Sequence, residues 1–397
     1  MQTNCRITPV SIDSSERRLR LLLVVDSYFP GNGGTEAQAQ LLAELLQQRG
    51  HEVLVLAPQL DRARPLHETI RGIAVVRLSY PKIPSLGALW LIVKFALWLW
   101  RRRSRFDGIH LHMAKNLAAG AGMVQPWMRG PVLVKVSGAW EFDGGVLDPS
   151  LRRRPLHLFL NRYIRRVAFM QAISERTRER LLAMSYDPER IRMIPNAVDV
   201  ERFDKVPYPQ VERTPQATVI YVGRLQPVKG LTILLQAWQT VMTLRDARLV
   251  LIGDGPMRDE LAGMIEQLRL GASVAMPGHS TDVPSVLHRA QIYVQPSFQE
   301  GLPNSVLEAM TAGLPIVATR VSGNEDLVHD GVNGLLVPPR DSTALADALV
   351  RLIGDIPAAR RMGLASREII DAKYSSARVI RQLESLFLSA QHGEVAS

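Results

Sequence analysis

Cysteine is almost absent from this sequence: Cys5 is the only one among 397 residues. A single cysteine excludes both an intrachain disulfide framework and a cysteine-rich zinc site, and it is typical of proteins from a reducing compartment. Residues 1–18 also lack the apolar core that a secretory signal carries. We therefore expect a cytoplasmic protein that begins with a flexible leader, residues 1–18.

A long apolar run is missing as well. The most apolar segment, residues 86–106, has an apolar run of about fifteen residues that includes Lys94, whereas a membrane span needs roughly 20. Its tryptophans precede a cluster of arginines (Trp90, Trp98 and Trp100, then Arg101, Arg102, Arg103 and Arg105), a pattern typical of interfacial helices. The alternatives are a buried helix packed on a sheet and a marginal membrane span.

Charge is divided unevenly between the two halves of the chain. Residues 1–205 carry 31 Lys/Arg and 19 Asp/Glu, whereas residues 206–397 carry 17 and 19. A basic half predicts an anionic partner such as a membrane surface, although a solvated basic surface without a partner is the alternative. We expect no nucleic acid, because the arginines are not interleaved with aromatic residues as in a base-stacking surface.

Apolar runs alternate with amphipathic stretches, which predicts an α/β protein built from right-handed βαβ units. A proline- and charge-rich linker near residues 205–215 divides the pattern, so we expect two Rossmann-like, doubly wound parallel-sheet domains facing each other across a cleft. The boundaries are 19–205 and 206–376, followed by a C-terminal helical segment, 377–397. The expected strands are RLLLVVDSYF, EVLVLAP, GIAVVRL, GIHLHM, VLVKVSG and FMQAIS in the first domain, and ATVIYVGRL, RLVLIGDGP, SVAMPG, IYVQPS and PIVATR in the second.

Two loops that follow strands have the composition of phosphate sites. The first holds Gly31, Gly33 and Gly34 ahead of a helix, which suits a phosphate, although such turns commonly serve geometry alone. The second, GRLQPVKG, places Arg224 after a strand and Lys229 before the next helix. Two cations beside a helix N-terminus are suited to clamp a diphosphate.

The stretch FQEGLPNSVLEAMTAGLP contains two glutamates, Glu300 and Glu308. We expect a helix from near Ser305 to Gly313, with Ser305 and Glu308 forming a capping box. Glu300 lies in the loop before this helix and would face a polar ligand. The pattern therefore does not predict a pair of equivalent acid/base carboxylates.

These motifs, together with GGTE, AISERTRERL, IRMIPNAVDVERF and VSGNEDLVHDGVNGLLVPPRD, resemble the retaining glycosyltransferases of family four, the group-one glycosyl transferases. The resemblance extends over roughly residues 20 to 385 and implies a GT-B fold. It further implies a nucleotide-sugar donor, UDP- or GDP-linked, with neither a cofactor nor a metal.

The resemblance also implies roles for individual residues. Arg224 and Lys229 match the cations that neutralise the donor diphosphate, Glu300 the acid at the donor sugar, and Glu308 the acid at the ribose. The catalytic set is therefore Glu300, Arg224 and Lys229. Further donor-binding positions are Gly33 and Gly34, whose loop closes over the diphosphate, and the backbone of Leu302, Pro303, Asn304 and Ser305.

One position departs from the family pattern: Ser137 stands where many members carry a histidine. In the same loop, Glu141 and Asp143 are candidates for the acceptor side. His112 either lines the acceptor side or is a structural histidine.

The predicted function is the transfer of a sugar to a lipid-linked acceptor or a growing surface polysaccharide or glycolipid. Residues 86–106 and the basic N-terminal domain would hold the enzyme against the anionic inner face of the cell membrane. The alternatives are a transferase for a small metabolite or sugar, a sugar-nucleotide epimerase of similar fold, and a non-catalytic protein that binds a membrane surface or nucleic acid.

Overall fold

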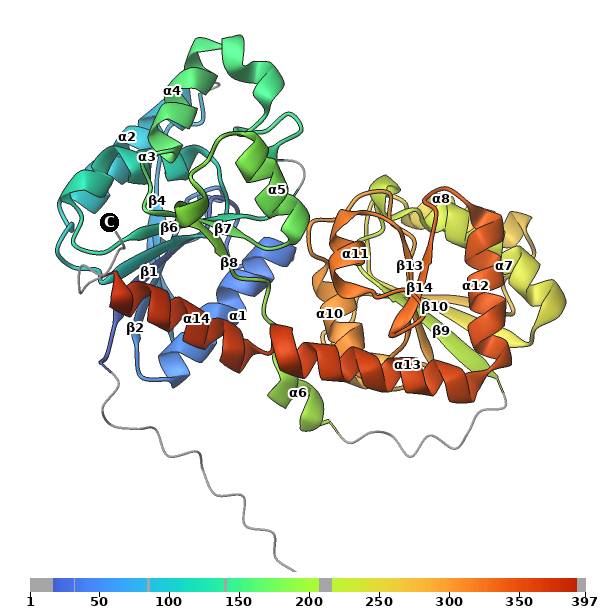
Figure 1. Ribbon diagram of the computed structural model, residues 1–397. Coiled ribbons are helices and arrows are strands. Elements are labelled where there is room, and N and C mark those ends of the chain that lie inside the picture. Colours follow the sequence, from blue (N-terminus) through green and yellow to red (C-terminus); the bar gives the residue numbers. More distant parts are fainter. Residues whose placement is uncertain (1–16, 32, 84–85, 139–140, 207–215, 391–397) are drawn as a thin grey trace, which may run out of the picture.

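The computed structural model describes residues 17–31, 33–83, 86–138, 141–206 and 216–390 (Figure 1). Most of the expected leader, residues 1–16, and of the expected linker, residues 207–215, lies outside the described residues. The chain forms two α/β halves side by side, each built around one sheet.

The N-terminal half contains an eight-stranded sheet in the order β3-β4-β2-β1-β5-β6-β7-β8. All neighbouring strands are parallel except β3, which pairs antiparallel with β4. The sequence patterns did not predict β3 and β8, the two edge strands. The strands are β1 (Arg20–Val24), β2 (Glu52–Pro58), β3 (His67–Ile70), β4 (Ile73–Leu78), β5 (Gly108–Leu111), β6 (Val132–Val136), β7 (Phe169–Ala172) and β8 (Ile191–Met193).

The C-terminal half contains a six-stranded parallel sheet in the order β11-β10-β9-β12-β13-β14. Strand order reverses between β9 and β12, and in such sheets ligands bind at the carboxyl ends of the strands beside this switch point. The edge strand β14 was not predicted. The strands are β9 (Ala217–Val222), β10 (Ala247–Ile252), β11 (Val274–Gly278), β12 (Ile292–Gln295), β13 (Ile316–Thr319) and β14 (Gly334–Val337).

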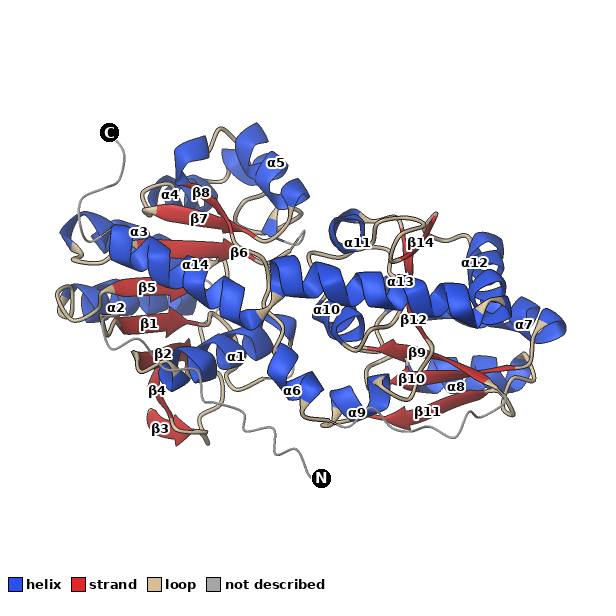
Figure 2. Ribbon diagram, turned by 60° about the horizontal axis from the view of Figure 1, so that its bottom comes forward, coloured by secondary structure: helices blue, strands red, loops and turns tan. Residues whose placement is uncertain are grey.

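Helices connect these strands and cover both faces of each sheet (Figure 2). In the N-terminal half they are α1 (Gly34–Gln48), α2 (Leu86–Trp100), α3 (Asn116–Val124), α4 (Pro155–Ile164), α5 (Glu175–Ala183) and α6 (Val200–Asp204), with short turns η1 (Gln125–Trp127), η3 (Pro149–Arg153) and η4 (Pro188–Arg190). In the C-terminal half they are η5 (Pro227–Lys229), α7 (Leu231–Leu244), α8 (Arg258–Gln267), α9 (Val283–Leu287), α10 (Asn304–Thr311), α11 (Ser322–Leu327), α12 (Ser342–Gly354), α13 (Ile356–Ile369) and η6 (Ile370–Tyr374). The last helix is α14 (Ser376–Ser389).

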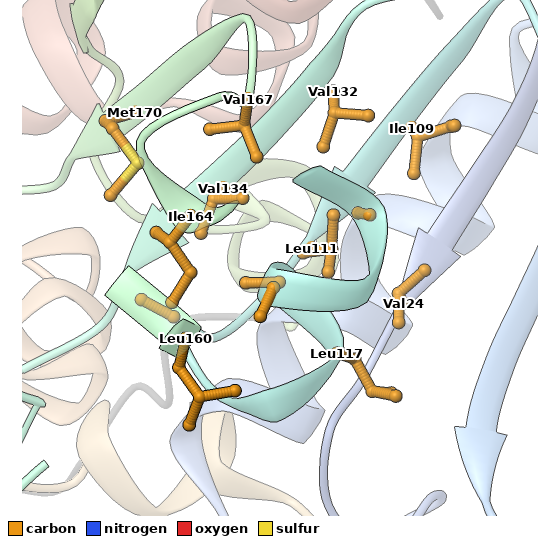
Figure 3. Close-up of a cluster of buried hydrophobic side chains, with 14 of the residues drawn as sticks. Val24, Ile109, Leu111, Leu117, Val132, Val134, Leu160, Ile164, Val167 and Met170 are labelled. Atoms are coloured by element: carbon orange, nitrogen blue, oxygen red, sulfur yellow. The ribbon is translucent and has the colours of Figure 1, made fainter. Parts of the chain in front are cut away.

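The N-terminal core has two layers, one on each face of its sheet. The crossovers through α2, α3 and α4 all progress in the same direction across the sheet, so right-handed connections place these helices on one face and α1 on the other. The two buried apolar clusters follow this division. Figure 3 shows part of the first cluster, in which Leu117 from α3 and Leu160 and Ile164 from α4 pack against strand residues such as Ile109 and Val134.

The C-terminal helix α14 joins the two halves. Figure 2 shows α13 and α14 crossing from the C-terminal half to the N-terminal half, where α14 packs beside α1. The ring of Phe387 lies against Gly108, where a Cβ atom would come within 2.4 Å of it. Glu384 accepts hydrogen bonds from Arg49 at 2.7 Å and contacts His51 Nε2 at 2.7 Å. The helix is therefore an integral part of the N-terminal core.

Helix α2 occupies most of the apolar segment 86–106. It buries one side, including Leu91, Phe95 and Leu99, against the sheet and leaves large apolar side chains such as Trp90 and Leu97 exposed on the other. It is 15 residues long, and no helix in the described part of the chain is both long and apolar enough to cross a membrane. The packed-helix and interfacial-helix hypotheses therefore both remain, and the marginal membrane span is wrong.

Phe387→Ala should loosen the attachment of α14. We expect the free energy of unfolding of the N-terminal half to fall by about 3–5 kcal/mol, because the variant loses a buried aromatic ring. The ring packs on Gly108, which has no side chain to fill the space, so its removal leaves a cavity. Urea unfolding followed by circular dichroism measures the change. Leu364→Ala, at an exposed α13 position, is the control and should unfold like the unchanged protein. Equal midpoints for Phe387→Ala and the control would contradict this packing role.

Candidate active site

The loop between β9 and η5 places two cations at the carboxyl end of a central strand. Arg224 is exposed, and its carbonyl oxygen accepts a hydrogen bond of 3.1 Å from the buried Tyr221 hydroxyl, which fixes the loop backbone. Lys229 ends the turn η5, immediately before α7. Both predicted cations thus lie in the loop beside the switch point of the sheet.

Lys229 and Glu300 form an ion pair with a distance of 2.7 Å between Nζ and Oε1. The Glu300 side chain is only 8% exposed, and its Oε1 also accepts a 2.6 Å hydrogen bond from Gln295 Nε2. The Ser322 hydroxyl donates to the Glu300 carbonyl at 2.7 Å and holds the loop. Lys229, which is expected at the diphosphate, and Glu300, which is expected at the sugar, are therefore in direct contact.

The predicted capping box is wrong. Helix α10 begins at Asn304 with Pro303 as its N-cap residue and no side-chain cap, so Ser305 lies inside the first turn and cannot act as the cap. The predicted end is confirmed, since Gly313 follows the C-cap with φ of +72°. Glu308 is left without a capping role, and burial raises its pKa to about 7, with Arg202 opposing the shift.

Tyr293 connects the two glutamates electrostatically. It is fully buried in β12, and its hydroxyl lies 3.1 Å from Val222 O and 2.8 Å from Gln295 Oε1, either of which can accept its one proton. Burial raises the pKa of Tyr293, and the carboxylates of Glu300 and Glu308 both add to the rise. The two carboxylates therefore act on one buried phenol, although they belong to a loop and a helix.

The N-terminal half meets the donor loop at Asn304. Its Nδ2 donates to the carbonyl oxygen of Gly34 at 3.0 Å, and its Oδ1 accepts from Asn196 Nδ2 at 2.8 Å. Asn196 also donates to the Leu302 carbonyl oxygen at 3.0 Å. Gly33 is the N-cap of α1 and Gly34 its first residue, so the N-terminus of α1 points at this loop. The glycine loop and the segment from Leu302 to Ser305 are therefore brought together.

The structure places Glu141 inside the protein and not on an acceptor-facing surface. It is fully buried, and its two oxygens accept hydrogen bonds from the backbone amides of Ala114, Ser137 and Gly138. Burial raises its pKa to about 8, although these three amides oppose the rise. Glu141 thus positions the loop that contains Ser137, whose hydroxyl donates to the His112 carbonyl oxygen at 2.7 Å.

His112 is fully buried too, with its ring centroid 4.3 Å from that of His110. Burial lowers the pKa of His112 well below its usual value, and His110 and Lys135 add to the shift. Burial also lowers the pKa of Lys135 to about 7, against the effect of Glu141. This environment agrees with a structural histidine beneath the loop and not with an acceptor contact.

Asp143 lines a cavity of about 240 Å³ between the two halves. The N-terminal half contributes Phe142, Asp143 and Arg180 to this cavity, and the C-terminal half contributes Glu300 and Ser322, among others. Asp143 pairs with Arg180, whose guanidinium carbon lies 4.3 Å from the centroid of the Phe142 ring. Of the candidates for the acceptor side, Asp143 is thus the one that faces open space next to Glu300.

Two family models match the chain, one in each half. Residues 32–202 match "Glycosyltransferase Family 4", and residues 216–355 match "Glycosyl transferases group 1". The chain is a family-four glycosyltransferase. The resemblance predicted from the motifs is thereby confirmed.

This glycosyltransferase has relatives that match it over nearly its whole length. It is 29% identical to the phosphatidyl-myo-inositol mannosyltransferase of Mycobacterium leprae, covering 96% of this chain and 100% of that one. It is 25% identical to the N-acetyl-alpha-D-glucosaminyl L-malate synthase of Bacillus anthracis, covering 90% and 94%. The structure of Anabaena HepE, solved in complex with UDP, superimposes with a TM-score of 0.75 at 21% identity, covering 94% of this chain and 100% of that one. The predicted GT-B fold is confirmed.

Several residues that position Glu300 and Asn304 were not predicted from the motifs. Gln295 and Tyr293 belong to the apolar strand β12, where their side chains gave no functional signal. Asn196 lies in IRMIPNAVDVERF, a segment that supports the resemblance, but its contact with Asn304 joins residues 108 positions apart.

Among the described residues, no group of three or more His, Cys, Asp or Glu side chains could hold a metal ion.

Glu308→Gln should change how stability depends on pH. The folded-state pKa of about 7 exceeds the usual 4.5, so the unfolded chain releases this proton first as pH rises. The free energy of unfolding that Glu308 contributes therefore falls as pH rises from 4.5 to about 7, by up to about 3 kcal/mol in total. Relative to the unchanged protein, Glu308→Gln should therefore be more stable near pH 8 than near pH 5. Urea unfolding at both pH values gives this difference. The control Glu368→Gln changes an exposed α13 carboxylate and should leave the pH dependence as it is; identical profiles for both variants would refute the assignment.

Proposed function

We propose that this glycosyltransferase moves a sugar, with retention of its anomeric configuration, from a UDP- or GDP-sugar to a lipid-linked or saccharide acceptor during synthesis of a surface polysaccharide or glycolipid. The observation that carries the proposal is the contact between Lys229 and Glu300, which lies at the carboxyl ends of β9 and β12, where the two halves of the molecule meet. A cation and a carboxylate held together there match the two ends of a sugar diphosphate.

The chemistry expected of the donor site follows from these charges. The leaving group is a nucleoside diphosphate whose negative charge grows as the sugar bond breaks, and Lys229 and Arg224 would stabilise that charge. Glu300 would accept hydrogen bonds from sugar hydroxyls, and Glu308 from the ribose. Lys229 would then pass from the Glu300 carboxylate to the diphosphate when the donor binds.

Retention and independence of a metal are part of the proposal. Two cationic side chains supply positive charge without an ion. Attack by the acceptor on the face from which the diphosphate leaves needs no carboxylate nucleophile. This suits Glu300, because Gln295 Nε2 already donates a hydrogen bond to its Oε1 and the carboxylate would orient sugar hydroxyls instead of attacking.

A lipid-linked acceptor is favoured by the exposed apolar side of α2 and the arginines that follow it. Exposed tryptophans beside arginines suit the surface of an anionic membrane. The M. leprae relative is named for a lipid acceptor, phosphatidyl-myo-inositol. We therefore propose that the enzyme works at the inner face of the cell membrane, through α2 and the basic N-terminal half.

A small-molecule acceptor is the second candidate, and the name of the B. anthracis relative, an N-acetyl-alpha-D-glucosaminyl L-malate synthase, favours it. The cavity beside Glu300, about 240 Å³ in volume, suits a small ligand. This candidate gives no reason for the exposed apolar side of α2.

A panel of nucleotide sugars tests the proposed donor. We expect one UDP- or GDP-sugar to bind saturably to the purified protein and to be hydrolysed slowly in the absence of an acceptor, with EDTA leaving both results unchanged. The anomer released to water, followed by NMR, reports retention. A protein that neither binds nor hydrolyses any member of the panel would not be the proposed transferase.

Lys229→Ala should weaken binding of UDP or GDP about 10–100-fold, because a charge-assisted contact with phosphate is lost. Isothermal titration calorimetry measures the affinity. Lys205→Ala removes an exposed lysine, 77% accessible, and serves as the control with unchanged affinity. Equal affinities for the two variants would remove Lys229 from the donor site, and thermal unfolding verifies that each remains folded.

A further inference from the structure

Helix α4 and the turn η1 carry exposed apolar side chains that the segment 86–106 does not include. In α4, Leu156 and Leu158 are each 54% exposed and Phe159 is 38% exposed, while in η1 Trp127 is 62% exposed. Soluble proteins seldom leave so many large apolar side chains exposed close together unless they meet a partner. A second apolar surface thus exists on the N-terminal half.

This surface is continuous with the exposed side of α2. The amide of Arg129, just after η1, donates to the carbonyl oxygen of Arg103, just after α2, at 3.0 Å. On the other side of η1, the amide of Ala168, which follows α4, donates to Gln125 Oε1 at 3.3 Å. The turn η1 therefore bridges the ends of α2 and α4.

Small residues in α3 allow α2 and α4 to pack closely on either side of it. A Cβ atom on Gly120 would lie 3.0 Å from the Phe95 ring of α2, and one on Gly122 would lie 1.9 Å from the Tyr163 carbonyl oxygen of α4. Seven of the nine residues of α3 are buried. The outer surface of this helical layer consequently belongs to α2 and α4, which pack on either side of α3.

Both helices have the same polarity relative to the cleft. Each connects two parallel strands and so runs antiparallel to them, which puts its N-terminus at the carboxyl edge of the sheet, where the loop with Ser137 and Glu141 lies. Most of their basic residues lie at the opposite ends, in Arg101 to Arg105 and Arg162 to Arg166, whereas Arg154 is the N-cap of α4 at the cleft end. The apolar surface thus extends from the cleft to a basic margin.

The charge of these elements suits one kind of occupant. Residues 86–106, 125–130 and 154–168 together hold ten Lys/Arg and no Asp/Glu. Arginines stack on aromatic rings at the basic margin, with Arg103 5.1 Å from the Trp100 ring centroid and Arg166 4.9 Å from that of Tyr163. Apolar side chains with a basic margin complement the acyl region and headgroups of an anionic bilayer.

We propose that α4 and η1, together with α2, form a single surface that lies on an anionic lipid bilayer and orients the cleft toward it. The inference rests on the proposed function, in which the acceptor is lipid-linked, and extends it with a second helix and an orientation. An acceptor headgroup would then enter the cleft at the N-terminal ends of α2 and α4, while its lipid stays in the bilayer.

Vesicle flotation tests the surface with the full chain. The vesicles are phosphatidylcholine with or without phosphatidylglycerol, at low and high salt. We expect binding only with phosphatidylglycerol and low salt, and about a tenfold loss of partitioning for Leu158→Ser/Phe159→Ser, for Trp127→Ser and for Trp90→Ser. Val332→Ser and Leu364→Ser change exposed apolar residues of the C-terminal half, 55% and 61% exposed, and should bind like the unchanged protein.

The outcomes separate this inference from the proposed function. Normal binding by the α4 and η1 variants, with loss only for Trp90→Ser, would restrict the membrane contact to α2 and overturn the inference. No vesicle binding by the unchanged protein would also overturn it, and so would an α4-dependent dimer in solution, which would assign this surface to a second copy. Affinity for UDP or GDP, measured on every variant, should stay constant and reports separately on the donor site and on folding.

Discussion

A buried carboxylate needs a positive partner, and the donor loop is organised around that need. Glu300 lies in the loop after the central strand β12 with 8% of its side chain exposed, so an unpaired negative charge there would be strongly destabilised. Lys229 and Gln295 provide the compensation. The position of Lys229 in turn depends on η5 and on the β9 loop, which Tyr221 fixes, so one ion pair sets the geometry of two loops that are 71 residues apart.

The same loop is where the two halves touch. A Cβ atom on Gly301 would lie 2.5 Å from the Ser137 carbonyl oxygen, so only glycine allows this approach, and three residues later Asn304 bonds to Gly34 and Asn196. The carboxylate of Glu141 holds the Ser137 loop by accepting a hydrogen bond from the Ser137 amide. A ligand placed at Glu300 is therefore close to both halves, which explains how residues of the N-terminal half take part in a site whose charged groups come from the C-terminal half.

The motifs predicted the fold and the loops in which Arg224, Lys229 and Glu300 lie, because strand patterns and the residues that follow them are local in sequence. The edge strands β3 and β8 carry charged residues and are only partly buried, so they form no apolar run. The edge strand β14 is apolar and as long as β5 and β7, which were predicted, and was nevertheless missed. Contacts between segments that are distant in sequence could not be predicted from local patterns. These contacts are the pairing of Lys229 with Glu300 and those that bury Glu141 and His112. Local inference also failed at Ser305, because the helix starts one residue earlier, after Pro303.

Helix α3 links the exposed apolar surface of α2 and α4 to the cleft. Its small residues let α2 and α4 pack closely on either side, and the loop before it receives the Glu141 carboxylate through the amide of Ala114. Larger residues at Gly120 or Gly122 would push the flanking helices apart. The buried Glu141 also joins that loop to the one containing Ser137. Contact of α2 and α4 with a surface would consequently be transmitted to the acceptor side of the cleft through packed side chains and backbone hydrogen bonds.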